Sequence, residues 1–153
     1  MYTTVRHVIA HKGSLVHAVS PDATLDEVVA LMGQHQIGAI LVLEHERVLG
    51  IVTERECIAQ VLWKRRFHGG SRVADIMCTN IPTVSPPESI QYCMQVMTKD
   101  RVRHLPVTDN GKLVGLISMG DVIHAQLSDQ QRVIESLEQY ISGSPSTEPP
   151  PPF

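Results

Sequence analysis

Two short motifs in this chain place a hydroxyl and a carboxylate three positions apart, where both side chains could contact a ligand. Thr53 is followed three positions later by Glu56, and Ser118 by Asp121, each pair directly after a run of apolar residues. A carboxylate can accept hydrogen bonds from the hydroxyls of a ligand, and the first amides of a helix favour an anion such as phosphate. The same spacing also suits a helix cap. The two roles do not exclude each other, so both motifs are candidates for ligand contact.

Cationic side chains that could hold phosphate stand elsewhere in the chain. Arg101, Arg103 and His104 fall within four positions, just before a second apolar stretch. Phosphate is the natural complement of such a cluster, although a solvated surface would explain it as well. Arg55 could bind phosphate or form a surface ion pair. Lys12, next to a glycine, is a further phosphate candidate or an ordinary exposed lysine.

An internal repeat relates the two motifs. Val19-Ser20-Pro21 returns as Val84-Ser85-Pro86, an offset of 65 positions, and the same offset maps Gly50 onto Gly115 without a gap. We interpret this as a tandem duplication. Each copy reads as strand, helix, strand, strand, helix, with a capping box at Thr24 and a hairpin signal at Asn110. A half of this size is too small to be stable alone, so the copies should pack on each other.

The two copies differ where they could contact a ligand. Gly38 and Ala39 stand at the positions equivalent to Arg103 and His104. They supply no charge, but they permit close approach of the backbone to a base. The two sites are therefore expected to be chemically unequal. We expect Ile37, Ile81 and Thr83 to form the apolar walls of a ligand site or to contact a base. Packing in the core would explain these residues equally well.

The repeated pattern resembles a cystathionine-beta-synthase (CBS) domain pair over roughly residues 5–127. The stretches Gly50 to Glu56 and Gly115 to Asp121 fall where that family has its ligand motif. The resemblance implies an α/β (α+β) fold of tandem repeats, each a small sheet packed by two helices and related by a pseudo-two-fold axis. It also implies adenosine-containing ligands in clefts between the repeats, with Asp121 holding the ribose hydroxyls. Glu56 is one methylene longer than the family's usual Asp.

We divide the chain accordingly. The first repeat with an N-terminal helix is predicted at residues 1–64, a linker at 65–80 and the second repeat at 81–127. A C-terminal amphipathic helix follows at 128–142, starting near Asp129, and then a disordered or polyproline-like tail at 143–153. The apolar stripe of that helix could recruit a partner, but a homodimer contact is the simpler role. This stripe consists of Val133, Leu137, Tyr140 and Ile141.

Composition argues against several functions. The net charge of −3 and a single short basic run speak against nucleic acid as a partner, and no apolar stretch is long enough to span a membrane. Few aromatic residues are present, so we expect aliphatic side chains to pack against the base of any ligand. Three cysteines without a C-x-x-C motif, and no secretory signal, favour a reducing compartment and a cytoplasmic location. His7 and His11 have helical spacing, but no third ligand marks a metal site.

The sequence therefore predicts a regulatory module rather than an enzyme, because no nucleophile and base can be placed together. Its ligand is expected to be AMP, ADP, ATP or NAD(H), with no catalytic cofactor and no metal. Ligand binding would signal through a conformational change to a protein effector that the sequence does not identify. The alternative is a ligand-free structural or dimerisation adaptor whose clefts are empty.

Overall fold

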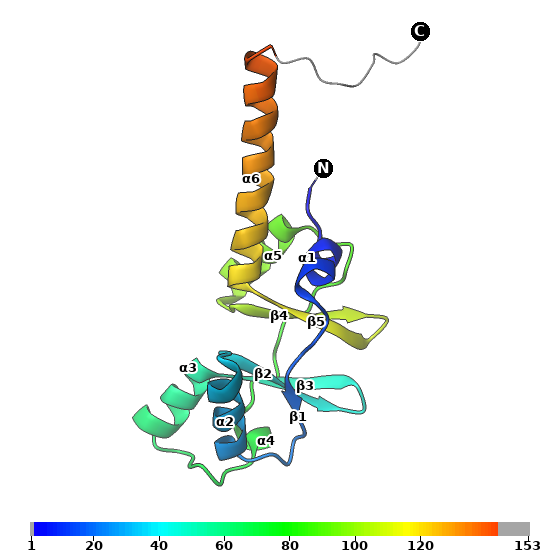
Figure 1. Cartoon of the computed structure of the whole chain (residues 1–153). Helices are drawn as coiled ribbons and strands as arrows, with labels where there is room; N and C mark the ends of the chain where they lie inside the picture. The colour runs from blue at the N-terminus through cyan, green and yellow to red at the C-terminus, as the bar shows by residue number, and fades with distance from the viewer. Residues whose placement is uncertain (1, 144–153) are drawn as a thin grey trace.

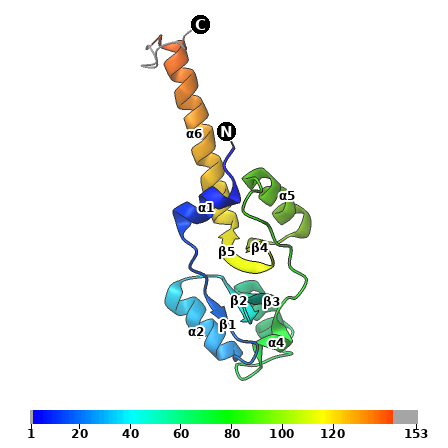
Figure 2. The same cartoon turned by 90° about the vertical axis from the view of Figure 1, so that its right-hand side faces the viewer.

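Two small sheets stack in the middle of the molecule, and helices cover their outer faces (Figures 1 and 2). In the first sheet β1 (Ala18–Val19) runs parallel to β2 (Ala39–Glu44), which is antiparallel to β3 (Arg47–Thr53). In the second, β4 (His104–Asp109) is antiparallel to β5 (Lys112–Ser118). The computed structural model describes residues 2–143. The predicted mixed fold of helices and small sheets is confirmed.

The two sheets meet through apolar side chains, so the repeats do pack on each other. Leu41 is fully buried and Ile51 nearly so in the first sheet, and Leu113 and Leu116 of β5 pack against them. Burying these side chains between the sheets stabilises the pair by removing apolar surface from water. Neither half could bury this face alone.

The backbone repeats the duplication seen in the sequence. Gln36 ends α2 (Leu25–His35) with φ 52°, and Arg101, 65 positions later, ends α5 (Ile90–Asp100) with φ 54°. The hairpin turns also match, because His45 and Asn110 have φ 50° and 51°. Left-handed conformations at non-glycine residues are uncommon, so their recurrence at one offset supports a duplicated unit. The predicted caps are confirmed, since Thr24 Oγ1 and Ser89 Oγ accept hydrogen bonds from the amides of Glu27 and Tyr92.

The short helix before each repeat packs against the other repeat. In α1 (Val5–Lys12), Val5 and Val8 join the core of the second half, and the Val5 amide donates to the carbonyl of Glu88 at 2.8 Å. In α4 (Val73–Ile76), Val73 is buried in the first half and its amide donates to the carbonyl of Ala23 at 2.7 Å. By packing, α1 thus belongs with the second repeat and not with residues 1–64.

The last helix of each half begins at a candidate motif. In the first half α3 (Glu54–Cys57) continues directly into a π-helix, η1 (Ile58–Trp63). In the second half α6 (Met119–Ile141) is one unbroken helix of 23 residues, not a helix ending near 127 and another starting near Asp129. No proline or glycine interrupts it after Gly120, so the backbone hydrogen bonds continue through Asp129.

The start of the second repeat differs from the sequence prediction in a smaller way. The strand expected at the start of the second repeat is reduced to a single parallel bridge between Val84 and Val107. Residues 144–153, on which most of the predicted tail falls, lie outside the described residues.

Candidate functional site

A pocket of about 910 Å³ opens between the two repeats. The first repeat contributes the start of α3, the linker contributes the segment near Asn80, and the second repeat contributes the segment entering β4. The isolated bridge between Ile51 and Cys78 holds the linker segment against β3. This pocket brings together eight of the predicted residues: Gly38, Thr53, Arg55, Glu56, Ile81, Arg101, Arg103 and His104.

Six predicted residues lie outside that pocket, and three of them are Ile37, Ala39 and Thr83. Ile37 lines a neighbouring hollow of about 720 Å³, which shares Gly38 with the first pocket. Ala39 is 4% exposed and packs in the core between the two sheets, which favours its structural role. Thr83 is exposed. Ligand contact at these three positions stays a prediction.

The carboxylate of Glu56 is only weakly engaged. Thr53 Oγ1 accepts a hydrogen bond from the Glu56 amide at 3.2 Å, which is the expected cap. Glu56 Oε2 lies 3.5 Å from Gln60 Nε2, at the limit of hydrogen bonding. Among the described contacts, the return bond from Glu56 to the Thr53 amide is not formed, so this capping box is only half made. The side chain can therefore accept hydrogen bonds from a ligand.

The predicted cations of the second repeat are not equivalent to one another. Arg101 and Arg103 are exposed, whereas His104 is partly buried. Burial lowers the pKa of His104, and the charges of Lys12 and Arg103 add to this, while Asp121 and Glu54 oppose it. The imidazole is therefore neutral at pH 7 and offers a hydrogen bond rather than a charge. The two arginines are the permanent cations of this cluster.

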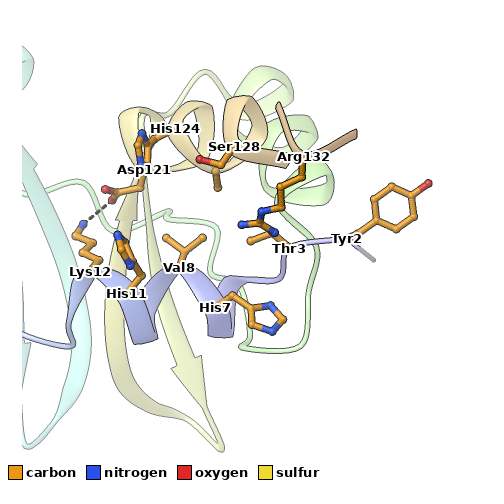
Figure 3. A pocket seen from close by; sticks show the side chains of 11 residues that line it. Tyr2, Thr3, His7, Val8, His11, Lys12, Asp121, His124, Ser128 and Arg132 are labelled. Atoms are coloured by element: carbon orange, nitrogen blue, oxygen red, sulfur yellow. Dashed lines mark hydrogen bonds and ion pairs between the residues drawn. The ribbon is translucent and has the colours of Figure 1, made fainter. Parts of the chain in front are cut away.

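Asp121 and Lys12 do not line this pocket and are paired with each other (Figure 3). Lys12 Nζ donates to Asp121 Oδ2 at 2.5 Å and to the carbonyl of Leu116 at 2.8 Å. Asp121 Oδ2 also accepts from the Ser118 amide at 2.8 Å, and Ser118 Oγ accepts from the Asp121 amide at 3.2 Å. The capping box here is thus complete. A ribose hydroxyl at Oδ2 of Asp121 would have to compete with Lys12 and the Ser118 amide.

The electrostatics of Asp121 agree with this pairing. Burial alone would raise the pKa of Asp121. The hydrogen bonds from Lys12 and Ser118 and the charge of Lys12 outweigh burial, so the pKa lies below its ordinary value. The carboxylate is therefore charged at neutral pH, and Lys12 compensates that charge. Lys12 and Asp121 line a smaller pocket of about 410 Å³ between α1 and α6.

Sequence reasoning missed several residues that line the 910 Å³ pocket. Trp63 is one of them, 78% exposed at the end of η1, although we expected only aliphatic residues to be available for a base. The sequence predicts a helix there, but it does not predict the wider π-helical turn that sets the direction of this side chain. The other missed lining residues are Ile51, Glu54, Ile58, Ala59, Cys78, Asn80 and Val102.

Two further features of residues 2–143 concern clusters of metal ligands and membrane-spanning helices. No group of three or more His, Cys, Asp or Glu side chains in that range is arranged to hold a metal ion. No helix in that range combines the length and apolarity that crossing a membrane requires.

Comparison with known families decides what this arrangement is. A family model for the CBS domain matches residues 14–62 and 73–128. The chain belongs to the CBS domain family. CBSX3, a mitochondrial CBS domain-containing protein of Arabidopsis thaliana, is 31% identical over 150 residues, which cover 92% of this chain and 73% of that protein. A CBS-domain protein structure from Burkholderia ambifaria is 37% identical with a TM-score of 0.78, covering 84% of this chain and 96% of that one.

Two more distant CBS structures contain ligands. The CBSX2 structure is a complex with AMP, at 24% identity and a TM-score of 0.65, covering 75% of this chain and 90% of that one. Another CBS domain pair is in complex with 5′-methylthioadenosine and S-adenosyl-L-methionine, at 19% identity and a TM-score of 0.74, covering 84% and 99%. At these identities the likeness shows a shared fold.

Proposed function

We propose that this CBS domain pair is a regulatory module that binds an adenine nucleotide or dinucleotide, namely AMP, ADP, ATP or NAD(H), in the 910 Å³ pocket. The main support for the proposal is the lining of this pocket. It combines Glu56 of one repeat, whose carboxylate is weakly engaged, with Arg101 and Arg103 of the other repeat. A volume of this order suits a small-molecule ligand. The ligands of the two distant CBS structures share an adenosine half, which supports the choice of class.

Each part of such a ligand has a chemically suitable partner in the lining. Thr53 and Glu56 can accept hydrogen bonds from the ribose hydroxyls, and Arg101 and Arg103 can bind phosphate through charge-assisted hydrogen bonds. Ile81 offers an apolar surface to the base. Arg55, from the first repeat, is a further candidate for phosphate. The ligand would thus touch both repeats and the linker at once.

Contact with both repeats gives the ligand a way to signal. A ligand that fits one relative arrangement of the repeats better than another shifts the population toward it by its difference in affinity. We propose that a protein effector responds to this shift and that the chain acts as a homodimer. The cytoplasmic location, the absence of catalysis and the exclusion of nucleic acid and membrane as partners stay predictions of the sequence.

An observation at the second motif favours the alternative function, an adaptor without ligand, for that half of the chain. Lys12 and the Ser118 amide both donate to Asp121 Oδ2, so this oxygen already has partners within the chain. We therefore propose one ligand per chain, at Glu56, with Lys12 occupying Asp121 in place of a ligand.

The test is a thermal-shift panel on nucleotide-stripped protein with AMP, ADP, ATP and NAD(H), comparing wild type, Glu56→Ala and the control Glu44→Ala. Glu44 ends β2 and is exposed outside the pocket. A ligand at about a hundred times its dissociation constant adds about 2.7 kcal/mol, which raises Tm by about 5 °C or more for a domain of this size.

We expect wild type and Glu56→Ala to separate in this panel. Glu56→Ala should lose most of the shift because the ribose loses its acceptor, while Glu44→Ala should keep it. A full shift in Glu56→Ala would contradict the site. The absence of any shift in folded, empty wild type would favour the adaptor.

A further inference from the structure

Apolar side chains recur along α6 with a seven-residue period. Leu127, Ile134 and Ile141 stand seven apart, and Ile123 and Leu137 fall four positions before the first and the last of them. All five are between 48% and 82% exposed. This spacing is that of the a and d positions of a coiled coil, with Gln130 as the one polar residue at a d position. We call this row of positions 123, 127, 130, 134, 137 and 141 the seam.

The distal part of α6 has no neighbour within the described chain. Both views show it extending away from the sheets and from α1 and α5 (Figures 1 and 2). The last described tie to the body is Asp129, which accepts hydrogen bonds from the amide and hydroxyl of Thr3. A helical segment of about ten residues is marginal in water by itself. An exposed apolar row on such a segment therefore requires another surface to cover it.

We propose that the seam forms a parallel, in-register, two-stranded coiled coil with a second copy of this chain. The proposal deepens the homodimer of the proposed function and does not depend on ligand binding. A heptad row is self-complementary, because the a and d side chains of one copy pack between those of another. The heptad pattern therefore favours a second copy of the same helix as the partner.

Gln130 decides the orientation. In a parallel, in-register pair it faces Gln130 of the second copy, and the two amides can hydrogen-bond to each other. In an antiparallel pair that aligns a with d positions, it would face Ile134 of the second copy. A buried amide without a partner is costly, so the parallel arrangement is favoured.

The residues beside the seam are compatible with this pairing. In a parallel pair, Gln126 of one copy lies near Gln131 of the other, and Val133 near Glu138, so no like charges meet. Val133 and Tyr140, which are 58% and 87% exposed, widen the apolar contact. The charged residues Arg132 and Glu135 fall at outward positions.

The first experiment measures self-association by sedimentation equilibrium for wild type, Leu137→Asp and Ser136→Asp. The last two place the same charge at adjacent positions, one on the seam and one off it. We expect Leu137→Asp to raise the dissociation constant of the dimer at least about tenfold, and Ser136→Asp to leave it within about threefold. A monomeric wild type at about 100 µM, or a Leu137→Asp dimer as tight as wild type, would overturn the proposal. Nucleotide-induced thermal shifts should be equal in all three proteins, so failure here is separate from failure of the ligand site.

The second experiment tests orientation by cross-linking. In a Cys57→Ser, Cys78→Ser background, where the remaining native Cys93 is buried, Leu137→Cys is oxidised alongside Ser136→Cys, and both variants keep Gln130. Parallel in-register pairing brings the two thiols introduced at position 137 together and separates the two introduced at position 136, so only Leu137→Cys should give a disulfide-linked dimer. Equal cross-linking of both variants, or none in a variant that sediments as a dimer, would overturn the parallel register.

Discussion

At the scale of single residues, the two carboxylates that the repeat makes equivalent have different surroundings. Asp121 completes a capping box with Ser118 and pairs with Lys12, and both the Ser118 amide and Lys12 bond to Oδ2, so this oxygen is engaged within the fold. Glu56 makes one long contact to Gln60 and lines the larger pocket. The sequence favoured Asp121 as the ribose ligand, because the family motif has Asp there. The surroundings in the folded chain favour Glu56.

Arg103 supplies a prediction at this scale. Arg103→Ala should weaken AMP by about tenfold or more and leave adenosine within about twofold, because only the phosphate loses a charge-assisted partner. His104 is neutral at pH 7, since burial lowers its pKa, so it cannot replace the lost charge. Isothermal titration with AMP and adenosine measures both affinities, and Arg47→Ala, at the exposed start of β3, is the matched control. Equal losses for AMP and adenosine would show that Arg103 does not bind phosphate.

At the scale of elements, the helix before each repeat packs into the opposite repeat. α1 contributes Val5 and Val8 to the second core, and α4 contributes Val73 to the first. Val8 and Val73 are themselves 65 positions apart. The two halves are therefore held together by these helices as well as by the contact between the sheets. For this reason the boundaries of the packed halves differ from the boundaries predicted from the sequence.

Val73 provides the prediction at the element scale. Val73→Ala should lower the free energy of unfolding by about 2 kcal/mol, because two methyl groups leave a fully buried site and a cavity remains. Val29→Ala, at a half-exposed position on α2, should cost less than about 0.5 kcal/mol. Urea denaturation followed by circular dichroism measures both values. Equal losses in the two variants would mean that α4 is not part of the core.

The sequence predicted the elements and the cap residues because these depend on local patterns. Capping at Thr24, Ser89 and Ser118 follows from side chains within one turn of the chain. The placement of α1 could not be predicted, because its partners near Glu88 lie more than seventy positions away in the chain. The pairing of Lys12 with Asp121 depends on that placement and was missed for the same reason. Trp63 was missed because its direction depends on a π-helical turn.

At the scale of the whole molecule, a duplicated chain has produced two unequal clefts. One is open, about 910 Å³, and combines residues of both repeats with the linker. At the other, Lys12 and the Ser118 amide both bond to Oδ2 of the carboxylate that a ligand would use. α6 begins beside this carboxylate and extends away from the sheets (Figure 1). The proposed ligand site and the proposed dimer contact thus lie in different parts of the molecule.

Isothermal titration of AMP, ADP, ATP and NAD(H) into the full chain tests the proposed arrangement, with the number of sites per chain as the readout. We expect at least one of these ligands to bind with one site per chain, because Glu56 is weakly engaged whereas Asp121 is paired with Lys12. Two equal sites per chain would contradict the proposal that Lys12 keeps ligand from Asp121. No binding of any of the four ligands to folded, nucleotide-free protein would contradict the sensing function itself.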